Sequence, residues 1–404
     1  MFEIIYSNVG LWFNLLIPFV IGLYLVLNHK DYILKEFLAQ VGLTLVFLFL
    51  MFLLLFSTTT DLLDREYWNG QVSSFSYYEK WTGEETYTEE QCSGSGKNRS
   101  CRTVTKTRRV YHPPYWEIIT SNGETISIDK NYFRRASSEF GKTFKKLYHS
   151  SQVSFGDGNK YVSYPNKVIP TAVSHTYTNY VVAAKKNVVN EQVSEQEFSS
   201  YLKNHSLREY PSTYRSTYGE TKLNRIIDTT GLFNRVASVP FLDAISAQYG
   251  ALKQVNPIIY VTDQGRDFSR ILKGYWNGAK KNDVVLILGV DKSSRQVIWS
   301  DVIVYTDNTD FIVDLQNKFT GLNVSDPKPI LTTLSNLIAT GYKRKPMEDF
   351  SYLKENITLE WYWQALILFL NILLSGFLFL KFLEKDIPNP FARFQKKSRR
   401  SRYS

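Results

Sequence analysis

The sequence is poor in the side chains from which most metal sites and many active sites are built. Its 404 residues include two cysteines and five histidines. No Cys-x-x-Cys pair occurs and the histidines have no ligand spacing, which argues against a zinc site. A nucleophile elbow and a phosphate-binding loop are also missing. The sequence therefore favours a protein without catalytic chemistry.

Long apolar runs are the clearest positive feature. Residues 361–380 are twenty consecutive residues without a charge, and about 20 apolar residues cross a hydrocarbon layer of roughly 30 Å. Residues 37–56 form the most hydrophobic run. Residues 11–27 form a shorter run that lacks the basic segment and the small-residue cleavage site of a signal peptide. The sequence thus predicts three transmembrane helices.

The positive charges predict the orientation of these helices. The formal net charge is +10, and the tail from residue 385 holds seven Lys/Arg and one acid, so +6 lies there. Short basic flanks stay in the cytoplasm, which places the tail and the loop with Lys30 and Lys35 inside and residues 58–360 outside. We expect a multi-pass inner-membrane protein with a periplasmic, or more generally extracytoplasmic, large domain and a cytoplasmic C-terminus.

The basic tail has two interpretations. It fits anionic lipid headgroups of the bilayer, or it serves only as a topology signal. Because most of the excess charge is concentrated beside a membrane helix, no nucleic-acid partner is expected.

The fold class predicted is an α+β membrane protein with three transmembrane helices, a β-rich extracytoplasmic region and an α/β sandwich domain. Its expected parts are a transmembrane hairpin over 1–57, the β-rich region over 58–228, the α/β domain over 229–345, a linker with the third helix over 346–382, and the basic tail over 383–404.

Several local patterns define the β-rich region. Alternation of apolar and small polar residues predicts strands over 67–81 and 101–111. Two β-branched runs around Asn122 and Gly123 predict a tight hairpin. Residues 129–149 have the apolar spacing of a helix, and 179–189 are expected to form a strand.

Cys92 and Cys101 enclose a polar loop of eight residues, SGSGKNRS, between two predicted strands. Directly opposed residues of a hairpin are close enough for a disulfide, and an extracytoplasmic location keeps such a pair oxidised. We predict a disulfide that contributes about 2–3 kcal/mol in the chain-entropy model.

The α/β domain is read from alternation of buried strands with helices. Strands are expected over 257–263, 280–291 and 294–307, and helices over 239–255, 265–278, 310–322 and 329–342.

Within this part, the segments IIYVTD, YWNGAKKNDVVLILGVD and VIWSDVIVYTD place Trp276 and Gly278 before a charged turn and Asn282 before a buried strand. This arrangement, over about 239–342, resembles the TPM domain of thylakoid and bacterial membrane proteins, although Asp283 stands where that family usually has glycine. The resemblance implies an extracytoplasmic domain that is often followed by a membrane helix, and a phosphatase activity attributed to some members. The YWNG to YYEKW element with its cysteine loop also looks like uncharacterised membrane proteins of bacteria and their phages.

Four acidic residues at strand ends are the candidate metal ligands: Asp263, Asp267, Asp283 and Asp291. Calcium binds several oxygen ligands of this type. The competing and favoured interpretation is that they cap helices and turns, in which case no cofactor is present.

The leading functional hypothesis is an integral inner-membrane protein whose outer domain binds an envelope protein partner without performing chemistry. A homo-oligomer is also compatible with the sequence. The alternative is a weak metal-dependent, phosphatase-like hydrolase that uses the strand-end acids and calcium.

Overall fold

The computed structural model describes residues 34–59, 62–94, 100–140, 143–147, 153–155, 159–184, 207–357 and 359–384, with a few single positions between 14 and 27 and near 200. The chain divides into two compact units, each described here by itself. The first unit comprises Met1–Asp64, Thr178–Glu191 and Pro346–Ser404, and the second comprises Arg65–Tyr177 and Gln192–Lys345.

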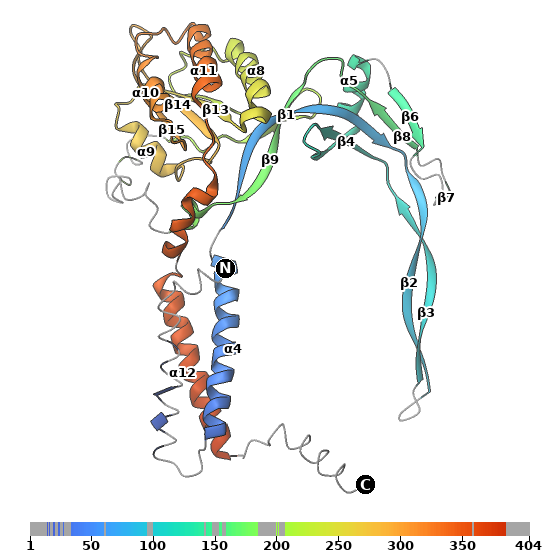
Figure 1. Cartoon of the computed structure of the whole chain (residues 1–404). Helices are drawn as coiled ribbons and strands as arrows, with labels where there is room; N and C mark the ends of the chain where they lie inside the picture. Colours follow the sequence, from blue (N-terminus) through green and yellow to red (C-terminus); the bar gives the residue numbers. More distant parts are fainter. Residues whose placement is uncertain are drawn as a thin grey trace. The chain divides into compact units, whose positions relative to one another are not determined.

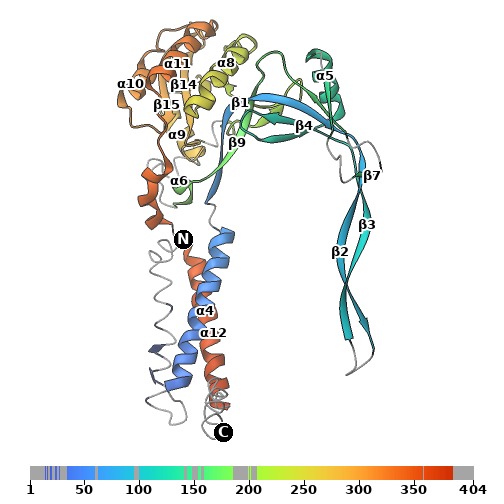
Figure 2. The same cartoon turned by 45° about the vertical axis from the view of Figure 1, so that its right-hand side comes forward.

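Two helices of the first unit are long and apolar enough to cross a membrane. They are α4 (Leu34–Thr59) and α12 (Trp361–Glu384), which contact each other and lie side by side in both views (Figure 1, Figure 2). Gln40 Nε2 donates to the Ser375 carbonyl at 3.5 Å between them. Two of the three expected spans are thus helices, whereas the first, over 11–27, and the basic tail lie largely outside the described residues.

The first unit also contains the short helix α6 (Tyr180–Ala183) and the 3₁₀ helix η3 (Met347–Asn356), which contact each other. The strand expected over 179–189 is wrong for the described part of that range. Asn179 caps α6 by accepting hydrogen bonds from the amides of Val181 and Val182 at 3.1 Å each. This side-chain cap favours a helical turn over the extended conformation that the valines prefer.

The second unit begins with a six-stranded sheet in the order β5-β4-β1-β8-β6, with β9 also paired to β1. Its strands are β1 (Leu63–Tyr78), β4 (Tyr115–Thr120), β5 (Thr125–Ile128), β6 (Thr143–Leu147), β8 (Asn159–Ser163) and β9 (Pro170–Thr178). The expected turn at Asn122 and Gly123 joins β4 to β5, and Gly123 has the positive φ of 81° that such a turn favours.

One helix, α5 (Lys130–Phe140), packs on this sheet through Phe133, Ala136 and Phe140, which join a core with Phe75 of β1. The predicted helix over 129–149 is correct only as far as Phe140. Residues Thr143–Leu147 instead form β6, because they pair with β8 in a regular antiparallel register.

A second sheet contains β2 (Trp81–Ser93), β3 (Ser100–His112) and the short β7 (Val153–Phe155). Strands β2 and β3 pair over thirteen residue pairs without a register shift. Figure 1 draws them as a long twisted ribbon. We call β2 and β3 together the arm.

The remaining main sheet has the order β12-β13-β14-β15. Its strands are β12 (Ile226–Asp228), β13 (Asn256–Thr262), β14 (Asp283–Asp291) and β15 (Gln296–Val304). The first three are parallel and β15 is antiparallel. Strand β12 therefore belongs to the α/β sheet, although sequence analysis placed residues 226–228 in the β-rich region.

Helices pack on the side chains of both faces of this sheet. They are α8 (Arg235–Lys253), α9 (Phe268–Tyr275), α10 (Thr309–Asn317) and α11 (Pro327–Gly341). Ile259 and Val261 share a core with residues of α8, α10 and α11, whereas Ile258 and Tyr260 pack with Phe268 of α9. This burial on both faces explains the uninterrupted apolar sequence of β13 and β14. The mixed α/β character predicted from the sequence is confirmed.

Candidate functional site

The structure does not bring the four candidate metal ligands together. Asp283 is the first residue of β14 and Asp291 is the last, so eight residue-to-residue steps along the strand separate them by roughly 26 Å. Asp263 follows the carboxyl end of β13 and pairs with Lys292 at 2.5 Å. Asp267 lies at the N-terminus of α9, where its side chain makes no capping hydrogen bond.

The side chain of Asp291 forms hydrogen bonds within the turn that follows β14. Its carboxylate accepts hydrogen bonds from the amides of Ser293 and Ser294 at 3.1 Å each. The hydrogen bond from the Ser294 hydroxyl, followed by those from the two amides, holds the pKa of Asp291 below its ordinary value. This geometry is the turn role that sequence analysis favoured.

Asp283 is buried, with 1% of its surface exposed. Its carboxylate accepts from Asn256 Nδ2 at 2.8 Å, from the Tyr210 hydroxyl at 2.9 Å and from the Lys280 amide at 2.8 Å. Burial raises the pKa of Asp283 to about 6, and these hydrogen bonds oppose the shift. The carboxyl group thus anchors the turn before β14 and the segment that carries Tyr210.

Arg225 extends this buried polar cluster. Its Nε donates to Asn256 Oδ1 at 2.8 Å and its guanidinium also donates to Asn69 Oδ1 at 2.6 Å. Asp243 of α8 lies 3.7 Å from the same guanidinium. Because Asn69 belongs to β1, Arg225 joins the six-stranded sheet to the α/β sheet within the second unit.

The contacts around Asn69 are close. A Cβ atom placed on Gly250 of α8 would lie 2.8 Å from the backbone nitrogen and oxygen of Asn69. Asn282 Nδ2 donates to the Tyr67 carbonyl at 2.7 Å. The Tyr67–Asn69 segment of β1, which belongs to the first of the two YWNG sequences, therefore packs closely against α8 and the turn before β14 and does not form an open site.

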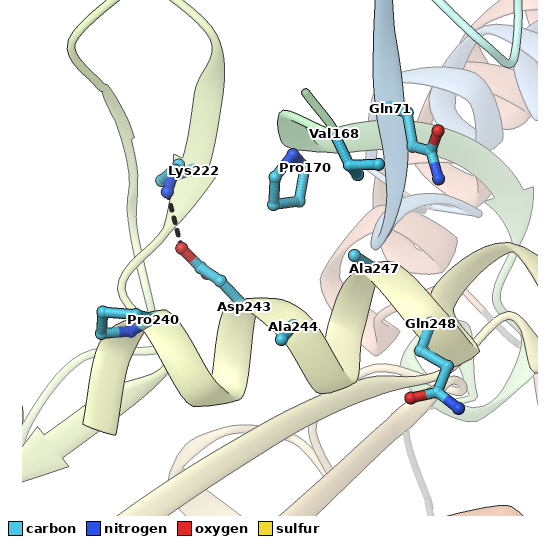
Figure 3. A pocket seen from close by; sticks show the side chains of 9 residues that line it. All are labelled: Gln71, Val168, Pro170, Lys222, Pro240, Asp243, Ala244, Ala247 and Gln248. Atoms are coloured by element: carbon cyan, nitrogen blue, oxygen red, sulfur yellow. Dashed lines mark hydrogen bonds and ion pairs between the residues drawn. The ribbon is translucent and has the colours of Figure 1, made fainter. Parts of the chain in front are cut away.

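An open cavity of about 530 Å³ lies beside this cluster. Its apolar lining comes from Val168, Pro170, Pro240, Ala244 and Ala247. Figure 3 shows Lys222 and Asp243 meeting at one end of it, with the amine donating to the carboxylate at 2.6 Å. The cavity is therefore mainly apolar, and the charges of Lys222 and Asp243 neutralise each other at its end. Such a cavity could hold a small ligand or a side chain of a partner protein.

The arm is the most exposed part of the second unit. Every residue from Glu84 to Gly94 is exposed, and none from Cys101 to His112 is buried. In the described part of the chain, strand β7 pairs with β2 only at Thr82 and Gly83. Among the described residues, the outer edge of β2 beyond Gly83 and the outer edge of β3 pair with no other strand.

Cross-strand ion pairs connect the two strands of the arm. Glu85 lies 3.2 Å from Arg108, and Glu89 lies 2.5 Å from Lys106. The hydrogen bond and charge of Glu89 raise the pKa of Lys106. These side chains are largely exposed, so each pair contributes little to stability, and the arm depends on other constraints.

One such constraint is the predicted disulfide. Cys92 and Cys101 are directly opposite each other in the β2–β3 register and are bonded to each other. The prediction that the flanks of the cysteine loop are paired strands is confirmed. Residues 95–99 lie outside the described residues.

Arg225, Asn256 and Lys222 were not predicted as site residues from the sequence. Arg225 directly precedes Ile226 and Ile227 of β12, and this position was the only sign in the sequence that it could be important. Neither residue spacing nor a motif indicated its partners. Those partners come from β1, β13 and α8, which are distant in the chain.

Comparison of the chain with protein-family models, with curated proteins and with solved structures finds no match.

Proposed function

We propose that this chain is an integral inner-membrane protein that uses its arm to bind a protein partner in the cell envelope. The observation that carries the proposal is a thirteen-pair β-ribbon whose β2 strand is exposed from Glu84 onward and whose two outer edges, beyond the β7 contact at Thr82 and Gly83, pair with no other described strand. An isolated two-stranded ribbon is at best marginally stable in water. Open strand edges bind extended segments through main-chain hydrogen bonds.

The membrane assignment is supported by the surfaces of α4 and α12. Only 28% and 22% of their apolar windows are buried within the chain. The core helix of a soluble protein would be mostly buried, whereas the lipid-facing sides of membrane helices need an apolar solvent. The proposal includes a third span over 11–27 and a cytoplasmic basic tail, with the second unit outside.

The topology is tested by thiol labelling in intact cells. A Ser398→Cys variant should react with a membrane-impermeant reagent only after permeabilisation, whereas Cys92 and Cys101 should react from outside after reduction. The reverse pattern would overturn the orientation and, with it, the envelope location of the partner.

Partner binding is tested by site-specific photo-cross-linking in cells. A photoreactive residue at Thr88 or Thr105, which are opposed on the arm, should capture a defined partner. Ser138, exposed on α5, is the matched control and should not. Equal products from all three positions, or none from the arm, would refute the arm as the binding element.

The hydrolase alternative receives no support from the positions of the strand-end acids. Asp283 is buried within hydrogen bonds to protein groups, and Asp291 lies at the other end of the same strand. The resemblance of residues 239–342 to the TPM domain stays a prediction, and it adds no catalytic group.

A further inference from the structure

The arm is divided by charge along its length. Strand β2 carries four acids and no base, whereas β3 carries four bases and no acid. The acids are Glu84, Glu85, Glu89 and Glu90, and the bases are Arg102, Lys106, Arg108 and Arg109. One open edge of the ribbon is therefore acidic and the other is basic.

Building on the proposed function of the arm, we propose that its partner is the arm of a second copy of this chain, with the β2 edge of one copy paired to the β3 edge of the next. Directly opposed unlike charges on neighbouring strands attract, and like charges repel. Pairing of β2 with β2 would oppose acids to acids, and pairing of β3 with β3 would oppose bases to bases. Only the unlike edges are complementary.

The strand directions agree with this arrangement. Because β2 and β3 are antiparallel within one arm, a second arm in the same orientation also presents its β3 antiparallel to the first β2. Copies anchored in one membrane share one orientation. The resulting contact is head-to-tail, so it generates a ring if the rotation closes and an open row if it does not.

The two edges lack three of the usual protections against edge pairing, which are proline, bulges and short strands. Charged side chains, the fourth, are present, but their opposite signs on the two edges favour pairing of unlike edges. Neither strand contains proline, and the pairing continues for thirteen pairs without a bulge. Threonines such as Thr86, Thr88 and Thr105 lie along the ribbon, and β-branched residues of this kind are enriched in paired strands.

The test uses the full chain purified in detergent, with its mass measured by light scattering over a range of concentrations. Glu85 and Glu89 share one face of the ribbon with Lys106 and Arg108, because residues two or four apart point to the same side. We expect self-association of the native chain, weakened at least about tenfold by Glu85→Lys with Glu89→Lys, or by Lys106→Glu with Arg108→Glu.

Two further measurements separate loss of association from loss of folding. An equimolar mixture of the two double variants should associate again, because one supplies the charge that the other has lost. The variant with all four substitutions keeps opposite charges within its arm and between copies, so it should associate like the native chain. Failure of both would overturn the pairing of unlike edges.

Hydrogen exchange gives a backbone readout. The outward-facing amides of β2 between Glu84 and Gln91 should exchange more slowly as the concentration of protein rises. Association that leaves these amides and the charge variants unaffected would assign the contact to other parts of the chain and overturn the inference.

Different experimental results would overturn the pairing of two arms and the proposed function of the arm. A chain that stays monomeric while Thr88 or Thr105 cross-links to a different protein would overturn the second copy as occupant and leave the arm as a binding element. Absence of any cross-link from the arm would overturn both.

Discussion

Replacing Arg225 by methionine is the most direct test of the buried polar cluster. Arg225 is 4% exposed, and it is held by Asn69 at 2.6 Å, Asn256 at 2.8 Å and Asp243 at 3.7 Å. Methionine fills a similar volume but donates no hydrogen bond. The substitution therefore removes the charge and its donors while leaving little empty space.

The expected loss follows from the groups left behind. Removing one partner of a buried ion pair costs about 3–5 kcal/mol, because the other charge and its neighbours remain desolvated. The two asparagine oxygens each lose a charged donor. Lys222 still donates to Asp243 at 2.6 Å, which keeps the loss within that range.

Native-state hydrogen exchange of the β13 amides is the assay, because it reports local stability in a chain with more than one unit. Loss of about 3–5 kcal/mol should accelerate exchange roughly a hundredfold to a few thousandfold. The control is Arg235→Met, at an exposed arginine, with an expected change within about 0.5 kcal/mol. Equal, small effects of both substitutions would refute the structural role assigned to Arg225.

Three other outcomes follow from the same structure. The raised pKa of Asp283, about 6 against an ordinary 3.8, means that the folded state binds the proton more tightly than the unfolded state does. Its contribution to the free energy of unfolding should therefore be largest below pH 4, fall by roughly 3 kcal/mol as the pH rises to 6, and not change further above pH 6. Unfolding measured as a function of pH should show this fall in the native chain and not in Asp283→Asn. A Cβ atom on Gly289 would lie 1.9 Å from the Trp299 ring, so Gly289→Ala should destabilise the α/β sheet by about 1–3 kcal/mol in denaturant unfolding, whereas Gly265→Ala, with no atom in the way, should not. Reducing the disulfide at the tip of the arm should remove about 2–3 kcal/mol of local stability, seen as faster proteolysis of the arm, and unchanged proteolysis would argue that the strand pairs alone hold it.

Local sequence patterns were sufficient for much of the fold. The apolar runs of α4 and α12 have the length and composition of membrane helices, and Asn122 with Gly123 specifies a turn that needs positive φ. The unbroken β-branched runs of β13 and β14 indicate strands buried on both faces. The Cys92–Cys101 bridge was predictable because its two strands are joined by one short loop.

Other parts of the fold were not predicted from these patterns. Asn179 caps the valine-rich segment that follows it, and this local cap outweighs the strand preference of the valines. Pairing with β8 makes a strand of the second half of a predicted helix. The sequence already places Asp283 and Asp291 toward opposite ends of one predicted strand, whereas the burial of Asp283 against Asn256 and Tyr210 comes from the tertiary structure.

Arg225 is the clearest case in which only the tertiary structure decides a residue's role. The sequence shows a single charge before a short apolar strand. Its significance comes from the asparagines of β1 and β13 and the aspartate of α8 that surround it. Burial is a property of packed elements, and it makes the pairing of that charge necessary.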